Sequence, residues 1–207
     1  RLSLHPGPFN CLASHKDYVV QNCVKDLSLQ ADQMDMLGMP MDHNAKINIH
    51  IGASYGDREK ALDTWCRNFE LLPENVQKRL TVENDDRPNL YSTKMLYESV
   101  YKRLGIPIVF DSHHFRCGPQ DSSYEDAFLM AYDTWPVGIR PMCHHSNSKK
   151  KYEDPSCKSV AAHSNYYYEA FDSCGKYVDV AMECKAKELG VIDYLDKFER
   201  ETELMAA

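Results

Sequence analysis

A chain of 207 residues, 43% of them hydrophobic, is long enough for one sizeable core and argues against two independent ones, so we expect a single domain over residues 1–207. The net charge of −7 argues against a protein that binds nucleic acid through bulk positive potential. It does not exclude an enzyme that reaches phosphates through bound cations, because the carboxylates that hold such cations contribute negative charge.

Six short apolar runs predict β-strands. Each run is too short for a helix, is rich in β-branched residues and is bounded by turn residues. In chain order they span residues 1–4, 47–51, 80–82, 107–110, 137–142 and 177–182.

Helical patterns fill the gaps between these runs. One predicted helix begins after Ser92, a suitable N-cap, and ends at Gly105, with Pro107 just beyond. Ser123 and Asp126 form a capping-box pattern that opens a further helix. Three other faces are Val20, Cys23, Val24 and Leu27; Leu62, Trp65, Cys66 and Phe69; and, in a closing helix, Leu189, Ile192, Leu195 and Phe198.

This alternation predicts an α/β fold with a parallel sheet and crossover helices. A doubly wound open sheet and a barrel both have this order. We expect a TIM-type (β/α)8 barrel of which about six of the eight strands are present. The chain opens at Arg1 inside a predicted strand, so we also expect that the missing strands precede it.

A residue of metal-ligand type stands at the carboxyl end of every predicted strand. In a parallel barrel these ends converge on one face, whereas in a doubly wound sheet they would spread along an edge, so the pattern favours the barrel. Each residue alone has an ordinary explanation, such as a hydrogen-bonded histidine or a glutamate at a helix start. Six coincidences are improbable. The residues are His5, His50, Glu83, Asp111 with His114, His144 and Glu183.

Imidazole and carboxylate ligands without thiolate suit divalent ions such as zinc or manganese. Six or more ligands exceed the three or four that one catalytic zinc ion needs, so we expect two or three ions per chain. Glu83 and Glu183 come from well-separated strands and are natural bridging carboxylates, because each has two oxygens.

Three functions are compatible with such a cluster. Metal ions about 3.5–4 Å apart suit in-line attack on a phosphodiester, which predicts a metal-dependent phosphoesterase acting on nucleic acid. A sugar isomerase or epimerase also uses Glu, Asp and His around two metals in a barrel. A catalytically degenerate barrel that only binds DNA or metal is the third alternative.

Eight cysteines are scattered along the chain and form no CxxC pair, so we expect reduced thiols and a cytoplasmic or nuclear setting. No apolar run approaches the roughly 18–20 residues that cross a bilayer, and no leader of the secretory kind opens the chain. We therefore expect a soluble monomer without a membrane partner.

The motifs RLSLHPGPFN, INIHIG, VENDD, FDSHH, HHS, AAHSNYY and MECKAKE, in this order, resemble the UV damage endonuclease family, a relative of endonuclease IV in the xylose isomerase-like barrel superfamily. The resemblance covers residues 1–188. It implies a DNA repair enzyme that nicks the phosphodiester 5′ to a UV photoproduct, leaving a 3′ hydroxyl, with manganese or similar ions. The metal ligands that it implies are His5, His50, Glu83, Asp111, His114, His144, His163 and Glu183, of which His163 follows from the resemblance alone.

The resemblance also implies contacts with damaged double-stranded DNA. After HPG the family has a glutamine and an aromatic residue that probe the damaged pair, and Pro8 and Phe9 stand there in this chain. Phe9 can still wedge between bases, whereas Pro8 has no side-chain amide. Met142 stands where the family has a lysine proposed to be a modified metal ligand, and a thioether is a poor ligand for a hard cation.

Several cations are further candidates for the site. The run Lys149, Lys150 and Lys151 follows a predicted strand and could touch phosphate, although such a run is more often a solvated face. Arg87 is expected to pair with phosphate or with a neighbouring aspartate. Lys185 lies two residues past Glu183, hence on the same strand face, and would orient a carboxylate or the scissile phosphate. The predicted catalytic residues are Glu83, Glu183 and Lys185.

Overall fold

In the computed structural model, which describes residues 1–199, six parallel strands form one sheet in which every strand pairs with the next along the chain. An ion pair between Arg1 and Asp179 joins the two edges of this sheet, so the sheet curls into a half-barrel. The expected barrel class, with six strands present, is confirmed. The strands are β1 (Leu2–Leu4), β2 (Ala45–Ile49), β3 (Leu80–Glu83), β4 (Ile108–Asp111), β5 (Met142–His145) and β6 (Asp179–Met182).

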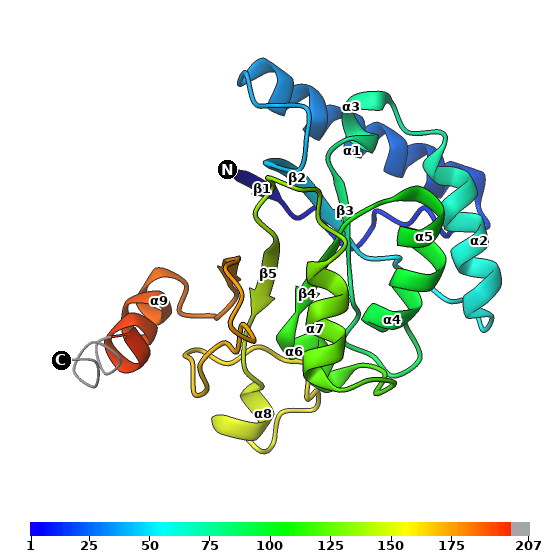
Figure 1. The fold of residues 1–207 in the computed structure, drawn as a ribbon. Helices are drawn as coiled ribbons and strands as arrows, with labels where there is room; N and C mark the ends of the chain where they lie inside the picture. The colour runs from blue at the N-terminus through cyan, green and yellow to red at the C-terminus, as the bar shows by residue number, and fades with distance from the viewer. Residues whose placement is uncertain (200–207) are drawn as a thin grey trace.

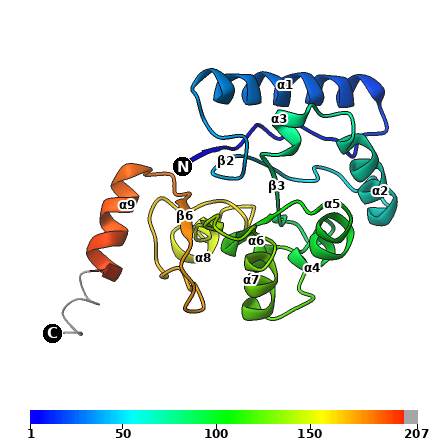
Figure 2. The ribbon, with the colours of Figure 1, turned by 45° about the horizontal axis from the view of Figure 1, so that its top comes forward.

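Helices α1, α2, α4, α5 and α7 cover the outer face of the curled sheet, while α9 stands apart from them (Figures 1 and 2). The helices are α1 (Asp17–Met36), α2 (Arg58–Phe69), α3 (Glu74–Gln77), α4 (Thr93–Leu96), α5 (Lys102–Leu104), α6 (Ser112–Cys117), α7 (Tyr124–Tyr132), α8 (Lys149–Tyr152) and α9 (Glu188–Tyr194). Two π-helical turns, η1 (Tyr97–Tyr101) and η2 (Leu195–Glu199), continue α4 and α9.

The predicted helix boundaries at serine and glycine are confirmed. Ser92 Oγ and Ser123 Oγ each accept a hydrogen bond of 3.1 Å from the backbone N–H three residues on, which caps α4 and α7. Gly105 ends α5 with a φ of 69°, in the left-handed region that a side chain would strain. These local signals therefore fix where α4 and α7 begin and where α5 ends.

The strand predicted over residues 137–142 is wrong, because β5 begins only at Met142. Pro136 and Pro141 flank a turn at Gly138, whose φ is 86°. Proline cannot donate to a strand ladder, so pairing starts after the second proline. His144 consequently lies inside β5 rather than after it.

Alternation along the strands divides the core into an apolar outer layer and a polar interior. Ile47 and Ile49 of β2 pack outward in the main apolar cluster, together with helix residues such as Trp65. The residues between and beside them, Lys46 and Asn48, are buried on the other face. The inner face of β2 is therefore lined with buried polar side chains.

The closing helix forms, but its apolar face is open. Leu189 and Ile192 are 58% and 56% exposed, and Gly190 is the buried residue of α9. All eight cysteines are free thiols. Within residues 1–199 no helix has the length and apolar character needed to cross a bilayer. The single domain, the monomeric state and the cellular compartment stay predictions.

Candidate metal centre

The carboxyl ends of the six strands bring the predicted ligands together. Because all strands run parallel, these ends face the same opening of the half-barrel. Six of the eight predicted ligands supply atoms that lie within 4.8 Å of one another in three overlapping groups. The groups are His5, His50 and Glu83; His5, His144 and Glu183; and Glu83, Asp111 and His144.

Glu83 is the centre of the cluster and is fully buried. Its Oε2 lies 3.3 Å from His5 Nε2 and 3.2 Å from His144 Nδ1. Its Oε1 lies 3.0 Å from His114 Nδ1 and 3.9 Å from His50 Nε2. Each oxygen thus faces two histidines of its own, which is the arrangement a carboxylate needs to bridge two cations.

Several of these contacts are close without being aligned as hydrogen bonds. His144 Nδ1 is 3.1 Å from Glu183 Oε1, yet it has no aligned partner, and neither Glu83 Oε1 nor Asp111 Oδ2 has one. A buried polar atom without a hydrogen bond costs about 1–3 kcal/mol. A shared cation would satisfy all of these atoms at once, and imidazole with carboxylate suits a divalent ion. The residues present therefore fit divalent metal binding.

Carboxylates and imidazoles are buried together in the cluster, and each group shifts the pKa of its neighbours. Burial lowers the pKa of His114, but the Asp111 and Glu83 carboxylates outweigh it and raise that pKa to about 10. Burial also lowers the pKa of His50, but the Glu83 and Asp85 carboxylates outweigh it and raise that pKa to about 9. Burial raises the pKa of Glu83, and the histidines reverse this and hold it well below its usual range. Cations that enter must displace these imidazole protons.

Two further residues orient the ligands. Asn48 donates from Nδ2 to Glu83 Oε2, and the Thr81 hydroxyl donates to Asn48 Oδ1 at 3.0 Å. Asp85 Oδ1 lies 3.2 Å from His50 Nδ1, close but not aligned as a hydrogen bond, and Nε2 of that ring faces Glu83. Such carboxylate–histidine pairs fix the ring of a metal ligand. Neither Asn48 nor Asp85 was predicted, although each is two residues from a predicted ligand on the adjoining strand segment.

Asn84 and Asp111 clamp the ends of β3 and β4. Asn84 Nδ2 donates to the Asp111 carbonyl at 3.0 Å, and the Asp111 N–H donates to Asn84 Oδ1 at 2.9 Å. Asp111 Oδ1 accepts from the backbone N–H groups of His113 and His114 and so caps α6. One carboxylate oxygen of Asp111 is thus used for structure, and the other points to the cluster.

His163 lies at the margin of the cluster. Its Nδ1 is 2.9 Å from the Glu183 carbonyl oxygen, which can only accept, so Nδ1 is the donor in this hydrogen bond. The ring centroid is 6.2 Å from that of His114. His163 belongs to none of the three close groups.

Lys185 is not on the strand face of Glu183 as predicted. β6 ends at Met182, and Lys185 lies exposed in the turn beyond it, with its N–H donating to the Ser164 carbonyl at 2.9 Å. The alternation argument therefore fails for this residue.

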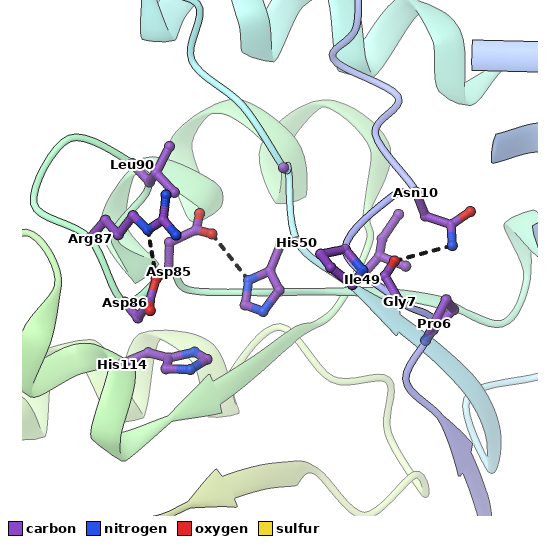
Figure 3. A pocket seen from close by; sticks show the side chains of 12 residues that line it. Pro6, Gly7, Asn10, Ile49, His50, Asp85, Asp86, Arg87, Leu90 and His114 are labelled. Carbon is purple, nitrogen blue, oxygen red and sulfur yellow. Dashed lines mark hydrogen bonds and ion pairs between the residues drawn. The ribbon is translucent and has the colours of Figure 1, made fainter. Parts of the chain in front are cut away.

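A cavity of about 400 Å³ opens beside the cluster, between the loop after β1 and the loop after β3 (Figure 3). In Figure 3 the His50 ring points into the space between these loops. Pro8 and Arg87 also line it, and Arg87 Nε lies 3.8 Å from Asp86 Oδ1. Phe9 is 88% exposed at the tip of the first loop.

The remaining predicted residues lie nearby but apart from the ligands. Lys149, Lys150 and Lys151 form most of α8, and the last two line a second cavity. Met142 lies on β5 two residues before His144 and packs with Val109 in a small apolar cluster.

The model of the UV-endonuclease UvdE family matches residues 1–206. The chain belongs to this family. Two curated relatives named UV DNA damage endonuclease, from Bacillus velezensis and Bacillus pumilus, are each 30% identical over 207 residues, which covers 95% of this chain and 61% of the relative. The chain thus spans about three fifths of the length of these UvdE-type relatives.

Solved structures agree with the UvdE assignment. The crystal structure of SacUVDE matches with a TM-score of 0.81 and 30% identity, covering 98% of this chain and 66% of that one. D-psicose 3-epimerase from Clostridium cellulolyticum H10 matches with a TM-score of 0.52 and 13% identity, covering 70% of this chain and 51% of the epimerase. The second likeness shows the barrel fold alone.

Proposed function

We propose that this chain carries the metal site of a DNA repair endonuclease that nicks the phosphodiester 5′ to UV photoproducts in double-stranded DNA. The single observation that carries the proposal is the convergence of four histidines on the two oxygens of buried Glu83. Membership of the UvdE family supports it, and so do relatives named UV DNA damage endonuclease.

The proposed cofactor is two or three divalent ions, with manganese first and zinc or magnesium as alternatives. When bound, such ions lower the pKa of water and neutralise charge on the departing oxygen. Glu83 and Glu183 are proposed to bridge them. Proposed to complete the ligand set are His5, His50, Asp111, His114, His144 and His163.

Residues of this chain would orient the ligands and the strand. Asn48 and Asp85 hold Glu83 and His50 in place through the contacts described above. Lys185 is proposed to meet the scissile phosphate from its exposed turn beside Glu183. A fixed geometry of this kind removes much of the orientational cost of the reaction.

The first cavity is proposed to receive the damaged strand. Phe9, exposed at the tip of its loop, would wedge between bases as apolar side chains do when they unstack a step. Pro8 would support that loop, and Arg87 would meet a phosphate. Of the predicted run Lys149, Lys150 and Lys151, the last two line the second cavity and are proposed to contact the DNA backbone, which positions the duplex without reading its sequence.

Two alternatives make different predictions. A sugar isomerase or epimerase would turn over a sugar and make no DNA contact, and the likeness to D-psicose 3-epimerase supports only the fold. A degenerate site, suggested by Met142 beneath His144, would bind DNA without cutting it.

The deciding experiment is nicking of UV-irradiated plasmid in the presence of manganese. We expect the unaltered protein to nick irradiated plasmid and spare unirradiated plasmid, and we expect the Glu83→Gln variant to be at least about 100-fold slower. Glu74→Gln is the matched control, because Glu74 is an exposed glutamate of α3 that pairs with Lys78. Equal nicking by the Glu83→Gln variant, or sugar turnover without nicking, would overturn the proposal.

A further inference from the structure

The second cavity borders the metal centre but contains none of its ligands. It has a volume of about 550 Å³ and is lined by parts of α6, α8 and the segment that leads to Glu169. His113, the neighbour of the ligand His114, is in its wall, and its ring centroid is 5.2 Å from that of His163. A group held in this cavity would therefore lie close to the reacting centre.

The lining of this cavity is positive in an acidic protein. Three cationic side chains and one carboxylate face it, whereas the whole chain has a net charge of −7. Of the four cavities described within residues 1–199, it alone has more than one lysine or arginine. The charged residues are Arg116, Lys150, Lys151 and Glu169.

Glu169 already shows how an anion fits between these cations. Its Oε2 lies 3.2 Å from Arg116 Nη2, and its Oε1 accepts from Lys151 Nζ at 3.1 Å and from the Tyr152 hydroxyl. Two oxygens that bridge a guanidinium and an ammonium are also what a phosphodiester offers. Lys150 has no ion-pair partner among residues 1–199, so the cavity keeps an uncompensated cation.

Asn147 adds an independent sign that the wall is incomplete. Its Oδ1 accepts from the N–H groups of Tyr168 at 2.8 Å and Glu169 at 3.3 Å, which fixes the orientation of the amide. The Nδ2 group is consequently held as a buried donor, and it has no hydrogen-bond partner. Such a group calls for an acceptor. An oxygen entering the wall here, from a ligand or from water bound beside it, would satisfy it.

We propose that this cavity is a subsite for one backbone phosphodiester of the DNA strand, held by Arg116, Lys150 and Lys151, and that Glu169 limits its affinity by competing for the same cations. The inference rests on the proposed function, because the DNA at the metal centre supplies the phosphodiester. It assigns different roles to lysines that the sequence shows as one run. Lys149 is in the same helix but outside the cavity wall.

The test is DNA affinity as a function of salt, measured by fluorescence anisotropy in EDTA so that no metal is involved. We expect Lys150→Gln to reduce the slope of log K against log salt by up to about 0.9, the value for one lost phosphate contact. Lys151→Gln should reduce the slope by less, because the Lys151 ammonium already pairs with Glu169. Lys149→Gln is the matched control of equal charge and should leave the slope unchanged. Equal effects of all three changes would overturn the subsite and indicate a solvated basic face.

Glu169→Gln tests the competing carboxylate with an effect of opposite sign. Removing its charge should strengthen DNA binding several-fold, whereas a purely structural Glu169 would give unchanged or weaker binding. Weaker binding by a Glu169→Gln variant that thermal unfolding shows to be folded overturns the proposal. If that variant does not fold, the salt dependence of the Lys150→Gln variant decides the case.

Chemically modified DNA identifies the group that is bound. In a set of duplexes with one neutral methylphosphonate linkage each, one position should remove the effect of Lys150→Gln. Persistence of the effect at every position, together with its loss in inorganic phosphate, would assign the cavity to free phosphate and overturn the DNA assignment. If the unaltered protein nicks irradiated plasmid but Lys150→Gln leaves the slope of log K against log salt unchanged, this inference alone is refuted. Absence of both DNA binding and nicking would also refute the proposed function.

Discussion

The two ends of the half-barrel interior hold charge in opposite ways. At the amino ends of the strands, Asp179 Oδ1 accepts from Arg1 at 2.7 Å and from Arg140 at 3.2 Å, so opposite charges meet in aligned hydrogen bonds. At the carboxyl ends, Glu83 is crowded by four histidines, and several of the atoms lack an aligned partner. The first arrangement is complete in the protein alone, whereas the second would be completed by the proposed cations. This matches the division of such barrels into a stabilising end and a functional end.

An apolar patch on β4, β5 and β6 lies between the two ends. Val109, Met142 and Ala181 pack together, and each comes two residues before a predicted ligand in the sequence. Strand alternation therefore places them directly below Asp111, His144 and Glu183. Such a floor lowers the local polarity and would strengthen the attraction between the predicted ligands and the proposed cations.

The largest effect should come from removing the central charge. Glu83→Gln leaves four histidines without their shared carboxylate, so we expect manganese affinity to fall by at least about 100-fold, a loss larger than removal of an orienting residue causes. Isothermal titration calorimetry measures this, with Glu74→Gln as the control. Unchanged manganese affinity in the Glu83→Gln variant would remove the contrast between the two ends.

A smaller loss is expected when an orienting residue is changed. Asp85→Asn weakens the contact of 3.2 Å to His50 Nδ1, and we expect a loss of about 10–100-fold in manganese affinity. Asp86→Asn is the matched control, because its carboxylate pairs with Arg87 at 3.8 Å and acts on the predicted ligand His114 through its charge. Equal losses for both variants would show that Asp85 acts only through general charge.

Gly118 allows the backbone after α6 to pack closely against the loop after β3, at the carboxyl ends of the strands. A Cβ at this position would lie 2.2 Å from the Asp85 carbonyl oxygen, so Gly118→Ala must push the loop after β3 away from α6. We expect a loss of about 1–3 kcal/mol in the free energy of unfolding, measured in urea. Gly7→Ala is the control, since its Cβ would come no closer than 3.8 Å to Phe9. A loss no larger than that of Gly7→Ala would show that the loop yields easily.

The smallest effect belongs to the amino end. Burial raises the pKa of Asp179, but Arg1 and Arg140 outweigh it and hold that pKa below its ordinary value. A carboxyl group whose pKa is lowered in the folded protein stabilises the fold above its ordinary pKa and loses this contribution as the pH falls through the folded value.

Asp179→Asn should therefore cost up to about 1 kcal/mol of stability at pH 7 and less near pH 3, without changing manganese affinity. Urea unfolding at the two pH values measures the difference. A loss that is independent of pH, or weaker manganese binding, would mean that the two ends are not separate.

The regular recurrence of strands along the chain made much of the candidate site predictable. Ligands that directly end or follow a strand, such as Glu83 and Asp111, could be read from the sequence because parallel strands all end at one face. His163 could not, because it lies in a loop and reaches the cluster through its bond to the Glu183 carbonyl. Its only signal was the family motif.

Other features depend on tertiary geometry. The orienting role of Asp85 requires the loop after β3 to fold back toward His50, which no local pattern encodes. The strand at 137–142 was misplaced because apolar composition outweighed two prolines in the prediction. Lys150 and Lys149 are equivalent in the sequence, and only the cavity distinguishes them.

The most direct test of the account is anomalous diffraction from crystals of the protein loaded with manganese. The account predicts two or three anomalous peaks among His5, His50, Glu83, His144 and Glu183, with at least one peak touching Glu83. Peaks confined to other parts of the surface, with these side chains contacting no ion, would contradict it.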